Sequence, residues 1–232
     1  MTAIPVVRIE RLETELVPGS WPFAEQHRVA IDANFAARKQ KTPALWNGRI
    51  LMLRDHAIEG ATFHGSFIEV DYASFLTWHD WGRPEAGAKD CFAQGALRAA
   101  DGAFLLGVMG PQTSHPGHIY FPGGTADRSD VVGTAVDLEG SVWREMQEEA
   151  GLTKADLTAG SGWHTMLAGQ RLAHLKIMQA RENADALRAR ILENLSRQPQ
   201  PELSDIRIVR GPGDLDPMMQ DFIVAFLNDA WA

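Results

Sequence analysis

Apolar and polar positions change their spacing several times along the chain. Residues 6–17 alternate apolar and charged side chains, which predicts a strand with one face in water. Residues 22–40 follow Ser20, a candidate N-cap, and predict a helix with Phe23, Val29, Ala30, Ala33 and Ala37 on a broad apolar face. Strand-like runs at 49–55 and 62–71 flank Glu59-Gly60, and a short helix is expected at 73–78. The N-terminal part should therefore mix strands and helices.

The second half of the chain alternates strand and helix patterns. The runs 91–98 and 103–109 surround an Asp101-Gly102 turn, which predicts a β-hairpin. Further strands are expected at 164–167, 172–179 and 206–209, and helices at 184–197 and 217–231. This order favours the α/β class, with a mixed sheet between helices. A Gly- and Pro-rich stretch at 81–88 is the best boundary, so we expect an N-terminal α+β lobe (1–88) packed on a second domain (89–232).

A helix around Arg144 carries the most distinctive pattern. Glu145, Glu148 and Glu149 stand at i, i+3 and i+4, so a helix places their carboxylates on one face. Like charges one turn apart destabilise a helix by a few tenths of a kcal/mol per pair. A divalent cation would offset that repulsion, since Mg²⁺ prefers oxygen ligands. The alternative is a solvated acidic face, because Glu is a common residue in surface helices.

The segment upstream of this helix adds a second signal. Residues 119–121 form a short apolar run, and Pro122-Gly123-Gly124 follows as a turn where backbone can approach a ligand closely. This lead-in and the run Arg144-Glu145-Met146-Gln147-Glu148-Glu149-Ala150-Gly151-Leu152 resemble the signature of the Nudix hydrolase superfamily (MutT-like). The second half of that signature is matched at every fixed position.

The first half of the signature departs from the family pattern. Nineteen residues (125–143) separate Gly124 from Arg144, six more than the family has. Val136 stands where the family has glutamate, and Asp137 and Glu139 are the nearest acids that could substitute. Asp137 could equally cap the helix, and we favour the cap.

The resemblance implies a fold, an activity and a set of site residues. It implies a Nudix-type α/β/α sandwich and hydrolysis, by water, of the diphosphate in a nucleoside diphosphate linked to another group. Carried over by position, Glu145, Glu148, Glu149 and the carbonyl of Gly123 would bind Mg²⁺ or Mn²⁺, and Arg144 would orient a glutamate. Many family members draw a further acid from beyond the signature. The candidates here are Glu193, Glu202 and Asp205.

The substrate is less sharply indicated. The Trp46-Asn47-Gly48 turn at 44–48, the strands after it and the inserted signature loosely resemble the UDP-glucose/UDP-galactose pyrophosphatase branch, which suggests a nucleotide sugar. His115 and His118 could meet a phosphate or base, or be solvated loop residues. Trp21, Trp46, Trp78 and Trp81 could stack on a base, although tryptophans are mostly packing residues. The alternative function is a Nudix-fold ligand-binding or regulatory module with little turnover, motivated by Val136 and the insertion.

Composition narrows the class of partner. The 232 residues are 45% hydrophobic, enough to bury a sizeable core, and carry a formal charge of −8. That charge argues against a nucleic-acid polymer as partner, which would favour a basic surface. Cys91 is the single cysteine, and residues 1–5 lack the features of a signal peptide, so we expect a cytoplasmic protein without a membrane partner. The sequence leaves a homodimer open.

Overall fold

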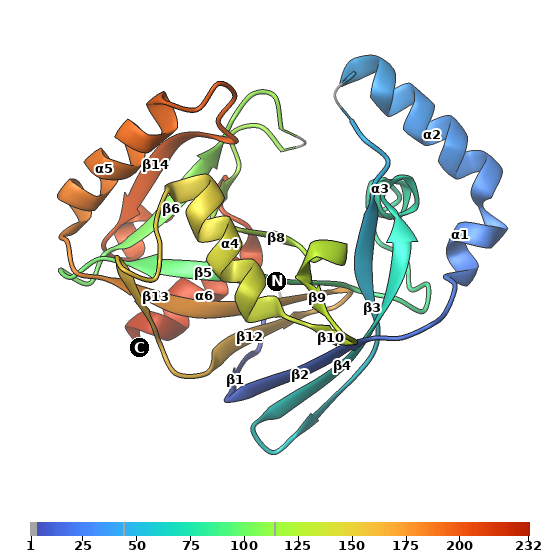
Figure 1. Ribbon diagram of the computed structural model, residues 1–232, viewed down its shortest axis with the longest axis horizontal. Helices are drawn as coiled ribbons and strands as arrows, with labels where there is room; N and C mark the ends of the chain where they lie inside the picture. Colours follow the sequence, from blue (N-terminus) through green and yellow to red (C-terminus); the bar gives the residue numbers. More distant parts are fainter. Residues whose placement is uncertain (1–3, 44, 114) are drawn as a thin grey trace.

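The computed structural model describes residues 4–43, 45–113 and 115–232 (Figure 1). Within them, the larger sheet has the order β1 (Val6–Ile9), β12 (Trp163–Ala168), β13 (Arg171–Ala180), β5 (Asp90–Arg98), β6 (Phe104–Met109) and β14 (Leu203–Val209). The short strands β7 (Ile119–Tyr120), β8 (Gly123–Thr125) and β11 (Leu157–Ala159) pair with β6, β5 and β13. β5 and β13 are parallel and the other pairs antiparallel, so the sheet is mixed.

A second mixed sheet lies beside the first. Its order is β3 (Arg49–Glu59), β4 (Thr62–Asp71), β2 (Arg11–Leu16), β10 (Ala135–Val136) and β9 (Val131–Val132), with β2 and β4 parallel. The α-helices are α1 (Pro22–Gln26), α2 (Arg28–Lys41), α3 (Tyr72–Asp80), α4 (Leu138–Ala150), α5 (Ala184–Ser196) and α6 (Asp221–Trp231). Two 3₁₀ turns complete the set, η1 (Arg128–Asp130) and η2 (Pro212–Asp214).

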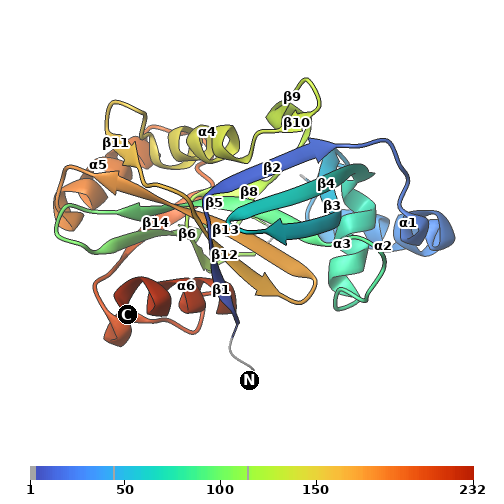
Figure 2. The ribbon, with the colours of Figure 1, turned by 90° about the horizontal axis from the view of Figure 1, so that it is seen from below.

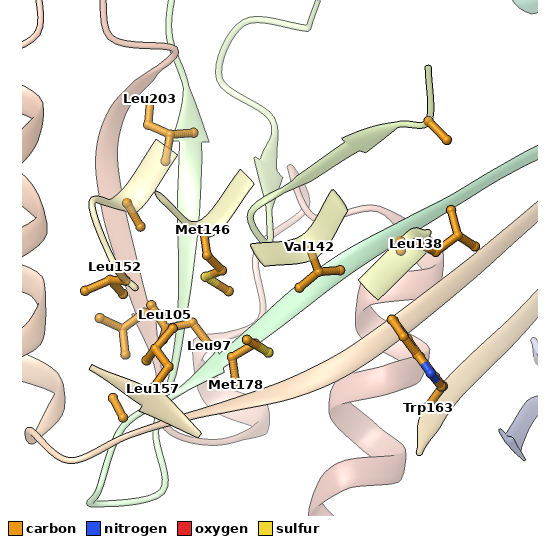
Figure 3. Close-up of a cluster of buried hydrophobic side chains, with 14 of the residues drawn as sticks. Leu97, Leu105, Leu138, Val142, Met146, Leu152, Leu157, Trp163, Met178 and Leu203 are labelled. Carbon is orange, nitrogen blue, oxygen red and sulfur yellow. The ribbon is translucent and has the colours of Figure 1, made fainter. Parts of the chain in front are cut away.

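The larger sheet is covered on both faces. α4 and α5 lie on one face and α6 on the other (Figure 2). Side chains of α4, including Val142 and Met146, pack with Leu97 and Met178 of the sheet (Figure 3). Beneath α6, a second core contains the aromatic side chains Phe92, Phe104, Phe121, Phe222 and Phe226. The predicted α/β/α sandwich with a mixed sheet is therefore confirmed.

The inserted residues of the signature are folded into the smaller sheet. They form η1, β9 and β10, and β10 pairs with β2 through Ala135 and Glu15. Val136 is buried, and Asp137 is the N-cap of α4, its Oδ1 accepting a hydrogen bond from the Gly140 amide at 2.8 Å. The cap that we favoured for Asp137 is confirmed.

The two halves of the chain exchange strands. β1 pairs with β12 of the larger sheet, while β9 and β10, from beyond residue 89, complete the sheet that holds β2, β3 and β4. The division into 1–88 and 89–232 stays a prediction. Two expectations fall partly on residues outside the described ones. Ala44 is the first residue of the turn predicted at 44–48, and residues 1–3 belong to the segment 1–5 that was compared with a signal peptide. No helix of the described residues has the length and apolar character needed to cross a membrane.

The helix predicted for 22–40 differs in two respects. It divides at His27 into α1 and α2, and Val29 is 86% exposed rather than part of an apolar face. The face of α2 that packs carries Ile31, which is buried, and Phe35, one turn later. The predicted face was correct at Phe23, which is buried, and wrong at the exposed residues Val29, Ala30, Ala33 and Ala37.

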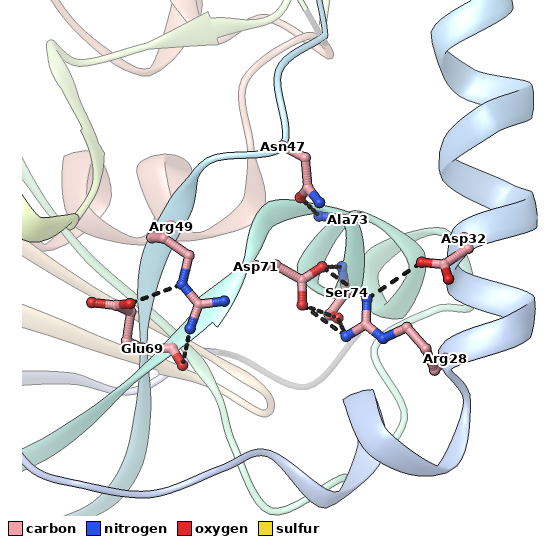
Figure 4. Close-up of polar contacts among 8 residues, drawn as sticks. All are labelled: Arg28, Asp32, Asn47, Arg49, Glu69, Asp71, Ala73 and Ser74. Carbon is pink, nitrogen blue, oxygen red and sulfur yellow. Dashed lines mark hydrogen bonds and ion pairs between the residues drawn. The ribbon is translucent and has the colours of Figure 1, made fainter.

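Polar contacts attach α2 to the start of α3. Asp71 caps α3, accepting from the Ser74 amide at 3.1 Å, and it also accepts from Arg28 Nη2 at 2.8 Å (Figure 4). Burial raises the pKa of Asp71, but the hydrogen bonds from Arg28 and Ser74 outweigh burial, so the net pKa is lowered. A carboxyl with a lowered pKa stabilises the fold when ionised.

We expect Asp71→Asn to lower the free energy of unfolding at neutral pH by about 1–3 kcal/mol, because the ion pair is lost and the cap weakened. Since the folded pKa is depressed, the wild type loses this stabilisation as pH falls below the unfolded value. The difference between variant and wild type should therefore shrink in acid. Urea denaturation across pH measures it, with Asp32→Asn, an exposed partner of the same Arg28, as control. Equal effects of the two substitutions would contradict the expectation.

Candidate functional site

The acidic helix α4 is held in place by a close approach to β5. A Cβ built on Gly95 would lie 2.3 Å from Cε of Met146 and 3.1 Å from Cγ1 of Val142. The glycine therefore allows the apolar side of α4 to rest on the strand. Gly151 ends the helix with φ 70°, in the left-handed region, as its place after Ala150 predicted. Glu145 and Glu149 adjoin this buried face, and Glu149 is itself buried.

The double glycine lies beside these glutamates. Gly123 has φ 153°, and a Cβ there would lie 2.5 Å from the carbonyl oxygen of Ala93, so a side chain does not fit. Its amide donates to Glu149 Oε1 at 3.4 Å. A Cβ on Gly124 would meet Glu145 Oε1 at 3.0 Å. Both glycines thus bring backbone against the carboxylates, which the lead-in of the signature requires.

Glu145 and Glu149 share a buried position. Burial raises the pKa of Glu149 well above its usual value, and the carboxylates of Glu145 and Glu202 raise it further. Burial also raises the pKa of Glu145, although Arg144 opposes the shift. A hydrogen bond between the two carboxyl groups lowers the pKa of Glu145 and raises that of Glu149. The pair therefore favours binding of a proton or a cation.

Glu202 is the downstream acid that the fold brings to this cluster. It lies in the segment before β14, and its pKa is raised by burial and then by Glu148. Glu193, by contrast, pairs with Arg197 on the surface, and Asp205 pairs with Arg188 at 2.7 Å. Of the three candidates, only Glu202 is electrostatically coupled to the signature glutamates.

Arg144 links α4 to the inserted segment. Its Nη1 lies 2.7 Å from Glu145 Oε1 and 3.2 Å from Glu148 Oε2, and its Nη2 donates to Asp130 Oδ1 at 3.0 Å. The Asp130 side chain is only 2% exposed. Burial lowers the pKa of Arg144, but these acids more than compensate, so the net pKa is raised. Asp130, which we did not predict from the sequence, is therefore the inserted carboxylate that contacts the signature arginine.

The residues present fit a divalent cation in their chemistry. They offer hard oxygen donors on one helix face, and the raised pKa of the carboxyl pair reflects burial and mutual repulsion, which a cation would relieve. Among the described residues, no group of three or more His, Cys, Asp or Glu side chains is arranged to hold a metal ion. Glu148 has 59% of its side chain exposed and contacts Arg144 Nη1 at 3.2 Å.

A cavity of about 400 Å³ opens beside Glu149. Its lining comes from α3, β5, the turn before β8 and the start of α6, and includes Gly123 and Gly124. His115 and His118, for which the sequence left two roles open, both line it. A larger open depression of about 890 Å³ lies along β2 and β4, but none of the signature glutamates borders it, so the smaller cavity is the one that matters for the acidic helix.

The tryptophans lie away from this cavity. Trp21 and Trp78 are buried in the core beneath α2, and Trp81 packs edge-on against Phe23 and His27. Trp46 is 78% exposed. None of these four tryptophans borders the cavity. The fold therefore supports a packing role for the two buried ones, Trp21 and Trp78.

Comparison with known proteins adds a likeness of fold. No family model matches the chain, and no curated protein does. Similar solved structures include a Nudix hydrolase from M. smegmatis, RenU, at 20% identity over 60% of this chain and 80% of that one, with a TM-score of 0.37. The Bacillus subtilis pyrophosphohydrolase BsRppH aligns at 12% identity over 64% and 84%, with a TM-score of 0.37.

A C. elegans Ap4A hydrolase aligns at 19% identity over 51% of this chain and 79% of that one, with a TM-score of 0.35. The likeness is to Nudix hydrolases. The assignment of roles to residues rests on the run 144–152 and its geometry in this chain.

The role of Asp130 can be tested by stability. Asp130→Asn should lower the free energy of unfolding by about 1–3 kcal/mol, because Arg144 would keep its charge and lose a buried partner. Asp55→Asn removes a carboxylate from an exposed pair with Arg54 and should cost less than about 1 kcal/mol. Urea denaturation of both variants measures the difference. A loss no larger than that of Asp55→Asn would show that the contact between Asp130 and Arg144 contributes little.

Proposed function

We propose that this protein is a divalent-metal-dependent hydrolase that cleaves the diphosphate of a nucleoside diphosphate linked to another group. The observation that carries the proposal is the convergence of Glu145, Glu149 and Glu202 beside the backbone of Gly123 and at the edge of a cavity, where Arg144 is the cation that contacts Glu145. Burying carboxylates next to one another destabilises the fold, and a bound cation would offset that repulsion. A nucleotide sugar is the first substrate to test.

The residues divide the work of the reaction. Glu145, Glu148, Glu149 and the Gly123 carbonyl would hold Mg²⁺ or Mn²⁺, and Arg144 keeps Glu145 oriented by their 2.7 Å contact. When bound, the cation cancels phosphate charge and lowers the pKa of an attacking water. Glu202 is the acid placed to take the proton of that water or to add a ligand, since it faces the same cluster.

A binding or regulatory module with little turnover is the second candidate. Val136 in place of the signature glutamate and the six-residue insertion favour it. The buried, mutually raised carboxyls weigh against it, because a module that binds without metal has no use for them. Turnover decides between the two.

We expect Glu149→Gln to abolish most diphosphate hydrolysis while the protein stays folded. Removing this buried carboxyl should leave the metal-free melting temperature unchanged or raised, because a folded pKa above the unfolded value costs stability at neutral pH. Mg²⁺ should raise the melting temperature of the wild type and not of the variant. Phosphate release from a panel of nucleotide sugars, with and without chelator, measures the activity.

Glu193→Gln is the matched control, since Glu193 lies on the surface and pairs with Arg197. It should keep wild-type turnover and the wild-type response to Mg²⁺. Metal-independent binding without product in the wild type would favour the binding module. Unfolding of Glu149→Gln would make the glutamate structural.

A further inference from the structure

The cavity beside the acidic helix follows one face of β5. Asp90, Phe92 and Gln94 are alternate residues of this strand, and all three line the cavity. In the strand register, Gln94 of β5 lies opposite Gly123 of β8, at the end near Glu149. Asp90 lies opposite Arg171 of β13, at the other end. Four strand positions span about 13 Å. A ligand whose phosphates lie near Glu149 therefore places a group several bonds away beside Asp90.

The Asp90 end holds polar atoms without partners. Asp90 is 7% exposed, and its Oδ1 lacks a hydrogen-bond partner among the described residues; the same holds for Nε of Arg83. Arg83 has φ 56°, the one non-glycine residue at positive φ in the described part of the chain. Holding a bulky residue there is strained, and such strain concentrates at functional positions. The backbone of 81–88 thus directs a guanidinium into this cavity.

Flat rings form much of the wall between these polar groups. The rings of His79 and His115 lie 5.5 Å apart, those of His115 and His118 5.5 Å apart, and those of His118 and Tyr120 6.0 Å apart and stacked. Burial, followed by the charge of Arg83, lowers the pKa of His79 to about 4, so this ring is neutral at physiological pH. Phe92 and Phe222 also line the cavity. Aromatic walls of this kind accept the face of a planar ring.

We propose that the Asp90 end of the cavity binds the nucleobase of the substrate, with the Asp90 carboxylate accepting from a base N–H and Arg83 donating to a neighbouring acceptor. The inference rests on the proposed function for the position of the diphosphate. Base edges present N–H donors beside oxygen or nitrogen acceptors, which matches one carboxylate next to one guanidinium. The aromatic rings of the cavity wall would stack on the face of the base, and Asp90 and Arg83 would hydrogen-bond with its edge.

A sugar fits this end less well. A buried hexose needs a partner for each of several hydroxyl groups. Two of the other polar side chains at this end are already engaged: Arg171 donates to Gln220 at 3.1 Å, and Gln220 contacts His118 at 2.9 Å. The linked sugar is therefore assigned to the acidic end of the cavity, beside Glu149.

Asp90 offers a variant that should fold. Burial raises its pKa to about 6, against the opposing charges of Arg83 and Arg171. Because the folded pKa lies above the usual value, the ionised carboxyl costs stability above pH 6, and the wild type gains stability as pH falls through that value. Asp90→Asn should therefore melt no lower than the wild type at pH 7.5. The exposed Asp185, paired with Arg210, provides the control Asp185→Asn.

The first experiment measures binding without turnover. AMP, GMP, CMP and UMP are titrated by calorimetry into the metal-free wild type, Asp90→Asn and Asp185→Asn. We expect the wild type to bind one base at least tenfold more tightly than the weakest, Asp90→Asn to reduce that ratio below threefold, and the control to keep it. A wild type that does not bind or does not discriminate, or a preference that survives in Asp90→Asn, overturns the inference.

The second experiment separates this inference from the proposed function. Hydrolysis is measured with Mg²⁺ for nucleoside diphosphate sugars that differ either in the base or in the sugar. Loss of base discrimination in KM for Asp90→Asn supports the inference, and loss of sugar discrimination with base discrimination intact overturns it. If no substrate turns over while base-selective binding depends on Asp90, the hydrolase proposal fails and the base site stands. If turnover is metal-dependent and Asp90→Asn keeps the base discrimination of the wild type, the base site is overturned and the hydrolase proposal stands.

Discussion

Buried carboxylates that face one another repel, and the structure of this chain is arranged to hold three of them together. Glu145 and Glu149 are brought together by α4, and Glu202 joins them from the segment just before β14. The repulsion is outweighed by the apolar side of α4, where Met146 rests on Gly95. Packing of α4 fixes the position of Glu145 and Glu149, and the contact of Arg144 with Glu145 offsets part of the repulsion.

Arg144 is the one cation that reaches this cluster from α4 itself, and it also faces Asp130. The inserted residues of the signature are folded into η1, β9 and β10, so the insertion is a built part of the smaller sheet. Through Asp130 it supplies a buried acid to Arg144, while Val136 points into the core. A carboxylate from a different place in the sequence can therefore support the signature arginine where the family glutamate is missing.

The sequence predicted what depends on local spacing. The three glutamates share a face of α4, Asp137 caps it and Gly151 ends it, all consequences of residues within one helix. Asp130 could not be predicted in the same way, because its contact with Arg144 depends on how the insertion folds. The apolar face of α2 was misplaced for a related reason, since the core that receives Ile31 is built by distant strands. One signal was present for the cavity: Asp90 and Gln94 are polar residues on the same face of an otherwise apolar strand.

The cavity shows why the N-terminal segment is needed beside the acidic helix. α3 and the residues after it contribute His79 and Arg83, and β5 contributes Asp90 and Gln94. The signature glutamates therefore come from one helix, α4, whereas the residues that line the cavity come from segments far apart in the sequence. An acidic helix alone can hold a cation near any diphosphate. Only the addition of α3 and of Arg83, held at a positive φ, gives the site a second end at which one substrate can be distinguished from another.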